Sequence, residues 1–252
     1  MEKTKVPVFQ FTPEFINPIN LAEYAVGITG IQGISVFFTK SKLDILKVRA
    51  MVDVKEKTIY LPILDYVDQL DLVSFRIIRA LLCHECAHII NHDYSYVFYG
   101  YRTREQRLIE EFAQTFDDLR IETLIGMEHE EIREEFRFMI ETFWLENYAI
   151  PPIRDTEIGY GRFGDFSHNL LGSLYWLLQK RYRRAYLSPP PGCSKILPFK
   201  PVRGMEALLE REIAPLLDPF VVSREPALKA AEQVLELLVR SYPVAFYRID
   251  KQ

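Results

Sequence analysis

The chain has 252 residues, of which 48% are hydrophobic and 26% charged, the composition of an ordinary globular protein with enough apolar material for a core. The formal net charge of −4 excludes a bulk electrostatic affinity for nucleic acid or for an anionic membrane surface. The first eight residues lack the apolar run of a signal peptide, and no apolar stretch is long enough for a membrane span. Three cysteines do not make a disulfide framework, so we expect a soluble cytoplasmic protein without nucleic-acid or membrane partners.

The N-terminal part, residues 6–65, has a strand-like pattern that predicts a small sheet. A β-branched and aromatic run covers residues 34–38, residues 48–54 alternate in polarity, and Thr58 to Pro62 predicts another strand. Pro62 indicates an edge strand or a strand end, because proline cannot donate to a sheet ladder. On an edge, the strand from Thr58 to Leu61 could pair with an extended peptide substrate.

From Asp71 to Asn91 the hydrophobic period becomes helical. A second helix is predicted to begin near Thr103, which forms a capping-box pattern with Gln106, and to end at Gly126. The remaining helices are predicted at 130–147, 166–186, 205–217 and 225–241.

These elements predict an α+β protein that is mostly helical, with the small sheet in front. We expect residues 1–187 to form one domain that contains the sheet at 6–65 and the two helices at 71–126. Residues 188–252 begin with a Pro-rich crossing segment and end in the C-terminal helices, and we expect them to pack on the same domain.

Two histidines lie four residues apart in the helix predicted at 71–91, within His84-Glu85-Cys86-Ala87-His88. This spacing puts both imidazoles on one helix face, close enough to bind one zinc ion. Glu85 lies beside them and can take a proton from an activated water and deliver it to a leaving amine. The H-E-x-x-H motif therefore predicts His84 and His88 as metal ligands and Glu85 as the catalytic residue; the alternative is two helical histidines in ordinary hydrogen bonds.

A third protein ligand must come from elsewhere in the chain. His92 continues the spacing, but eight residues of helix separate it from His84 by about 12 Å, too far for a shared ion. The second predicted helix carries acidic residues, and a carboxylate from a neighbouring helix would complete a His/His/acid site. The residue pattern alone leaves three candidates open: Glu110, Asp117 and Asp118.

Three segments follow one another in a recognisable order. They are Thr58-Ile59-Tyr60-Leu61-Pro62, then the H-E-x-x-H motif, then Gln114-Thr115-Phe116-Asp117-Asp118-Leu119-Arg120-Ile121-Glu122. This block resembles the metallopeptidase domain of phage and bacterial proteins related to cobaltochelatase subunits, where it often precedes a von Willebrand factor A domain. That family has a Thr-Ile-x-x-Pro strand, the H-E-x-x-H helix, and a helix ending in Asn-x-x-Glu-Asp-x-Arg-Ile-Glu.

The resemblance implies a zincin-like fold with Zn²⁺ as the cofactor and Asp117 in the place of the metal-binding glutamate. It also implies that Asp118 accepts a hydrogen bond from a ligand histidine and that Arg120 pairs with a nearby carboxylate. Two positions depart from the family pattern. Asp117 is one methylene shorter than glutamate, which requires closer helices, and Gln114 replaces asparagine.

We therefore expect a zinc metallopeptidase that hydrolyses peptide bonds in a peptide or protein substrate. The resemblance also implies a separate regulatory or von Willebrand A partner. The alternative is a metal-bearing scaffold or regulatory protein that has a zincin fold but no peptidase turnover.

Other polar residues near the motif are weaker candidates. Cys83 and Cys86 flank Glu85, and buried packing is the favoured role for them. Tyr160 and His168 follow a Gly-rich segment, where a side chain could stabilise an oxyanion, and ordinary loop and helix-end positions explain them equally well.

Overall fold

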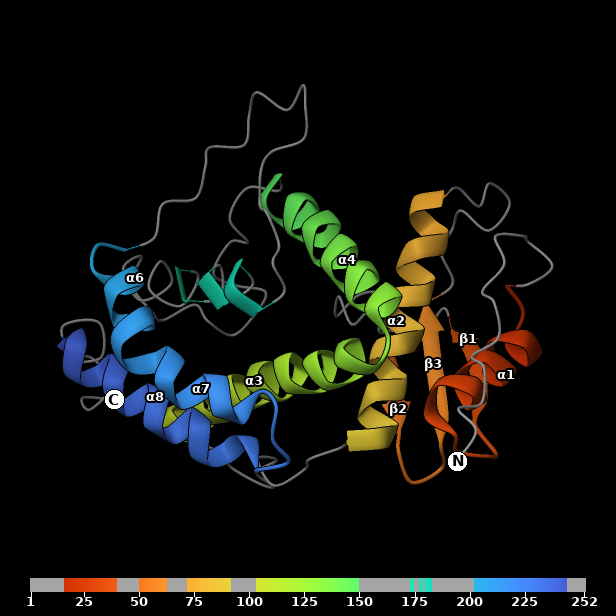
Figure 1. Cartoon of the computed structure of the whole chain (residues 1–252), viewed down its shortest axis with the longest axis horizontal. Helices are drawn as coiled ribbons and strands as arrows, with labels where there is room; N and C mark the ends of the chain where they lie inside the picture. Colours follow the sequence, from red (N-terminus) through yellow and green to blue (C-terminus); the bar gives the residue numbers. More distant parts are fainter. Residues whose placement is uncertain are drawn as a thin grey trace. The chain divides into compact units, whose positions relative to one another are not determined.

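The structure is a computed structural model that describes residues 16–39, 50–62, 72–91, 103–149, 173–174, 177–178, 180–182 and 202–243. Over these residues the chain is mostly helical with a small three-stranded sheet, which confirms the predicted α+β class (Figure 1). The chain divides into two compact units, residues 1–92 with 125–139, and residues 93–124 with 140–252. The predicted domain boundary at 187/188 lies outside the described residues.

The sheet belongs to the first unit and has the strand order β1-β3-β2. β1 (Ser35–Thr39) pairs in parallel with β3 (Thr58–Pro62), and β2 (Met51–Asp53) pairs with β3 in the antiparallel direction. β3 is therefore the central strand, and Pro62 is its last residue. The sequence analysis allowed two positions for Pro62, in an edge strand or at a strand end, and the strand end is confirmed. The prediction that Thr58 to Leu61 is an edge open to a substrate peptide is wrong, because both of its sides are already paired.

A helix that the sequence reading missed, α1 (Pro18–Thr29), lies within the part that we expected to be strand-like. The side chain of Asn17 caps it by accepting hydrogen bonds from the amides of Ile19 and Asn20, and proline occupies its first position. Gly30 ends it in the left-handed conformation at φ 69°. The two caps define this helix better than its weak hydrophobic period does.

α2 (Leu72–Asn91) contacts α1 and the β2–β3 hairpin in the first unit, and Figure 1 shows it running along β3. Its buried residues include Ile78 and Leu82, while Ile59 and Leu61 of β3 are fully buried in the same unit. Both bounds agree with the predicted helix at 71–91. Burial of this helix surface holds α2, and hence the H-E-x-x-H motif, in the fold.

α3 (Arg104–Glu128) begins with the predicted capping box: Thr103 Oγ1 accepts from the amide of Gln106, and the Gln106 side chain accepts from the amide of Thr103. The predicted stop at Gly126 is wrong, since α3 continues to Glu128. Gly126 instead permits a close approach to α4 (Glu130–Ala149), because a Cβ at this position would lie 3.1 Å from the Cβ of Arg133.

The second unit contains the C-terminal helices and a core that includes Phe112, Phe116, Leu217 and Leu238. α6 (Met205–Leu208), the π-helical turn η2 (Leu209–Ile213) and α7 (Ala214–Phe220) follow without a break. The amide of Ala214 bonds to the carbonyl of Leu209 five residues back, next to Pro215, which has no amide proton to donate. α8 (Ala227–Ser241) completes the unit and agrees with the predicted helix at 225–241.

The helix predicted at 166–186 is described only at a few positions, residues 173–174, 177–178 and 180–182, which are helical. Among the described residues, no helix combines the length and the apolar character needed to cross a membrane.

Candidate metal centre

α2 places the three motif residues where the sequence predicts them. Leu82 and Cys83 before the motif and Cys86 and Ala87 within it are completely buried, so the motif lies on an inward-facing part of the helix. His84 and His88 are half-buried, and Glu85 is 5% exposed. The histidines thus have the greater access to solvent, while the carboxylate of Glu85 lies deeper.

The imidazoles of His84 and His88 approach each other through their Nε2 atoms. Their Nε2 atoms lie 3.2 Å apart, and the two rings are nearly perpendicular, at 87°. Two nitrogens at 2.0–2.1 Å from one tetrahedral zinc ion would be about 3.3 Å apart. The observed separation therefore fits two ligands of one ion, and it also fits a hydrogen bond from one neutral imidazole to the other.

The acid grouped with these histidines is Asp118 of α3. One ligand atom from each of His84, His88 and Asp118 lies within 4.8 Å of the others, and the three residues form a candidate metal site. Two imidazoles and one carboxylate are a zinc donor set that leaves one coordination position open.

Asp117, which the resemblance puts in the role of third ligand, is not part of this group. Its side chain is fully buried, and its Oδ1 accepts hydrogen bonds from Arg120 through Nε at 3.0 Å and through Nη2. The structure thus pairs Arg120 with a nearby carboxylate, as the resemblance implies. It brings Asp118, one of the three acids left open by the residue pattern, to the histidines.

The other acid left open, Glu110, is half-buried on α3 and does not belong to the group. The remaining candidates from the sequence, His92, Tyr160 and His168, lie outside the described residues. The preference for Asp118 over Asp117 depends on which way α3 is rotated, and residue spacing alone does not contain that information.

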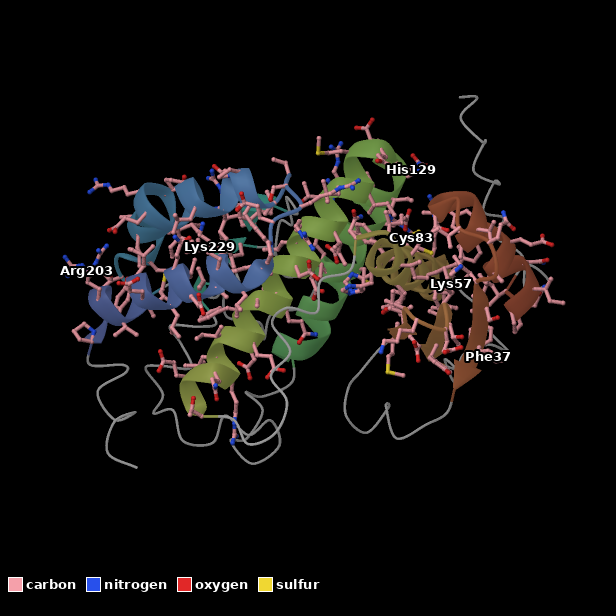
Figure 2. All side chains as sticks on the ribbon, turned by 90° about the horizontal axis from the view of Figure 1, so that it is seen from below. Phe37, Lys57, Cys83, His129, Arg203 and Lys229 are labelled. Carbon is pink, nitrogen blue, oxygen red and sulfur yellow. The ribbon has the colours of Figure 1, made fainter. Side chains whose placement is uncertain are left out.

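Cys83 and Cys86 are packed in the interior, as expected. Both are completely buried, and Cys83 is labelled on α2 in Figure 2. Burial raises the pKa of the Cys83 thiol to about 12, although Arg79 and the Tyr24 hydroxyl partly oppose the rise. Burial also raises the pKa of the Cys86 thiol. The group of possible metal ligands contains the two histidines of this helix and neither cysteine, which agrees with a packing role for the thiols.

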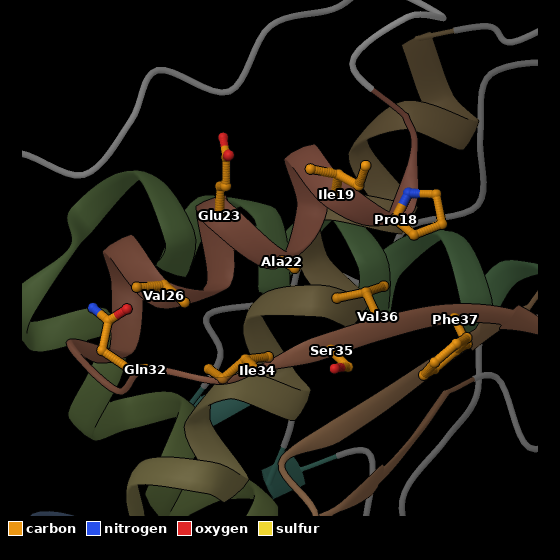
Figure 3. A pocket seen from close by; sticks show the side chains of 10 residues that line it. All are labelled: Pro18, Ile19, Ala22, Glu23, Val26, Gln32, Ile34, Ser35, Val36 and Phe37. Atoms are coloured by element: carbon orange, nitrogen blue, oxygen red, sulfur yellow. The ribbon is translucent and has the colours of Figure 1, made fainter.

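A separate groove of about 470 Å³ lies between α1 and β1 in the first unit. Figure 3 shows Ile19 and Val26 of α1 on one wall and Ile34, Val36 and Phe37 of the β1 segment on the other. Neither motif histidine lines this groove.

No protein-family model matches the chain, and comparisons with curated proteins and with solved structures found no matching protein. The resemblance therefore stays a prediction that rests on the three sequence segments.

Proposed function

We propose that the protein is a zinc-dependent hydrolase in which His84, His88 and Asp118 hold the ion and Glu85 is the general base. The observation that carries the proposal is the 3.2 Å approach of the two Nε2 atoms, because it matches the ligand spacing of one tetrahedral ion. The grouping of a carboxylate with the two histidines supports it. Three protein ligands leave a coordination position for substrate, as in catalytic rather than structural zinc sites.

The protein residues would divide the chemistry between them. When bound, zinc supplies Lewis-acid catalysis, because it polarises a carbonyl and makes water a stronger nucleophile at neutral pH. Glu85 would accept the proton of the attacking water and then donate it to the leaving nitrogen.

Peptide hydrolysis, as opposed to hydrolysis in general, is supported by the H-E-x-x-H motif and by the family resemblance. The substrate class that we propose is therefore a peptide or an unfolded protein segment. β3 lies at the centre of the sheet, so it does not offer a free edge to such a segment.

The test combines metal analysis with a Glu85→Gln variant. We expect one zinc ion per chain, cleavage of fluorescently labelled casein by the wild type, and loss of cleavage with retained zinc in E85Q. Glu128→Gln is the matched control, because Glu128 is an exposed glutamate at the end of α3. Purified protein without stoichiometric metal, or an E85Q variant that cleaves at the wild-type rate, would refute the mechanism.

A second candidate is a metal-bearing scaffold or regulatory protein without turnover, with a separate protein partner. The observation that favours it is the 5% exposure of Glu85, because a general base must be reached by the substrate. Stoichiometric zinc together with no cleavage of casein by the wild type would favour this candidate over the peptidase.

A further inference from the structure

The groove between α1 and β1 runs along the edge of the sheet. Its β1 wall contains four consecutive residues, 34–37. Because neighbouring side chains of a strand point to opposite faces of a sheet, a groove on one face would touch only every second residue. A groove lined by all four residues therefore follows the main chain of β1, on the side that faces away from β3. Both walls belong to the first unit.

The main chain of β1 has polar groups that point towards this groove. The amide of Ser35 donates to the carbonyl of Lys57 at 3.0 Å, on the β3 side of the strand. Since successive N–H and C=O groups of a strand point in alternate directions, those of Val36 point away from β3. Among the described residues no strand pairs with this side of β1, which makes it an edge of the sheet. An extended peptide can bind such an edge by main-chain hydrogen bonds.

The side chains around the groove indicate what kind of peptide fits. Ile19 and Phe37 lie at the same end of the groove and are 71% and 52% exposed, so apolar side chains of a peptide would cover them (Figure 3). Glu23 is exposed on the α1 wall, and among the described residues that line the groove it is the only ionisable one. A lysine or arginine of the peptide would pair with this carboxylate.

We propose that the groove binds an extended peptide segment of a partner protein as an added strand beside β1. Apolar side chains of the peptide contact Ile19 and Phe37, and a basic side chain pairs with Glu23. The inference goes beyond the proposed hydrolase, because it assigns a binding site to a surface that neither motif histidine lines. Metal-free protein should therefore bind the peptide as well as zinc-loaded protein does. Absence of zinc from the protein would refute the proposed function and leave this inference intact.

A phage-displayed library of random nine-residue peptides, selected on the whole chain, supplies the probe. We expect selected sequences in which apolar residues alternate and one lysine or arginine recurs. A fluorescent synthetic copy then gives dissociation constants by anisotropy. Alternate amides of an added strand face the protein, so methylation of those nitrogens should weaken binding at least about tenfold, and methylation of the others should leave it nearly unchanged. No enriched peptide, or equal effects of the two methylation patterns, overturns the inference.

Two pairs of variants test the side-chain contacts. Ile19→Ser should weaken binding about tenfold, because it removes apolar surface that the peptide buries. Met127→Ser is the matched control, since Met127 is 68% exposed in the same unit and does not line the groove. Glu23→Lys should weaken binding about fivefold, and a peptide whose basic residue is replaced by glutamate should restore it. Glu128→Lys is the control for charge reversal at an exposed site. Equal binding by the groove variants and their controls overturns the inference.

A photoreactive benzophenone side chain at position 19 identifies the occupant of the groove. Irradiation in the presence of the selected peptide should cross-link the peptide to the protein. A cross-link to the protein's own chain or to a second copy, unchanged by excess peptide, shows that the groove is already filled and overturns the inference.

Discussion

His84 and His88 face each other across one turn of α2, with their Nε2 atoms 3.2 Å apart. Two neutral imidazoles can share one hydrogen bond in this arrangement, but they can also share one ion. A shared metal ion requires a third ligand, whereas a hydrogen bond between the two imidazoles does not. Identifying the acid that binds the ion together with the histidines is therefore the most direct test of the site.

Asp118→Asn should weaken Zn²⁺ binding by at least about tenfold, because it removes the charged ligand that the structure groups with the histidines. Glu110→Gln should leave the affinity near its wild-type value, since Glu110 lies outside that group. Competition with a zinc chelator measures both dissociation constants. Equal losses in the two variants would contradict our assignment of the third ligand.

Lys57→Gly should stabilise the protein by about 0.5–1 kcal/mol. Lys57 has φ 50°, and a left-handed conformation costs a non-glycine residue about 1–2 kcal/mol, which glycine avoids. The gain is reduced because the variant loses the exposed hydrogen bond from Lys57 Nζ to the Gln32 carbonyl. Urea unfolding gives the free energy. Lys57→Ala is the control that loses the same bond but keeps the backbone cost, so it should not be stabilised.

Cys83 and Cys86 should resist alkylation in the folded protein. Both thiols are completely buried, so iodoacetamide can reach them only after local or global opening of the chain. We expect modification at least about 100-fold slower than in denaturant, measured at each cysteine by peptide mass spectrometry. Fast labelling of either residue under native conditions would show that this part of α2 opens readily.

Asp218→Asn should destabilise the protein slightly at neutral pH and not at all in acid. Hydrogen bonds from Arg181 lower the pKa of Asp218, and the Tyr182 hydroxyl adds to the effect. A carboxyl whose pKa is lower in the folded state stabilises above its unfolded pKa of about 3.9, and this contribution disappears as the pH falls through the folded pKa.

The size of the Asp218 effect should be below about 1 kcal/mol, because the pair is largely exposed and screened by solvent. Unfolding free energies of both proteins from pH 7 to pH 3 give the comparison. A difference that grows as the pH falls would have the wrong sign for this ion pair.

The helices α2 and α3 were predictable from the sequence. α2 has an uninterrupted helical period, and the reciprocal bonds of Thr103 and Gln106 locate the start of α3. The two histidines and Glu85 are fixed by spacing within one helix, so local geometry is sufficient to place them on it.

The helix α1 was missed although its caps are local, because its hydrophobic period is weak. The other features that were missed depend on contacts between distant residues. Glycine at position 126 is typical of a helix end, but here it lies inside α3 beside Arg133, whose side chain would have to shift to admit a Cβ. The central position of β3 depends on β1 joining it from an earlier part of the chain. The choice between Asp117 and Asp118 depends on Arg120, whose buried bonds to Asp117 occupy one of two consecutive acids.

The strand order also has a consequence for the path of folding. β2 and β3 are joined by the four-residue turn 54–57 and can form a hairpin locally, within microseconds for an isolated hairpin. β1 must instead find the far side of β3 across the intervening chain, and closing that loop costs entropy before the parallel pairing can compensate for it. We expect β1 to be the last strand to gain amide protection during refolding, so the sheet in front of the motif helix would be completed late.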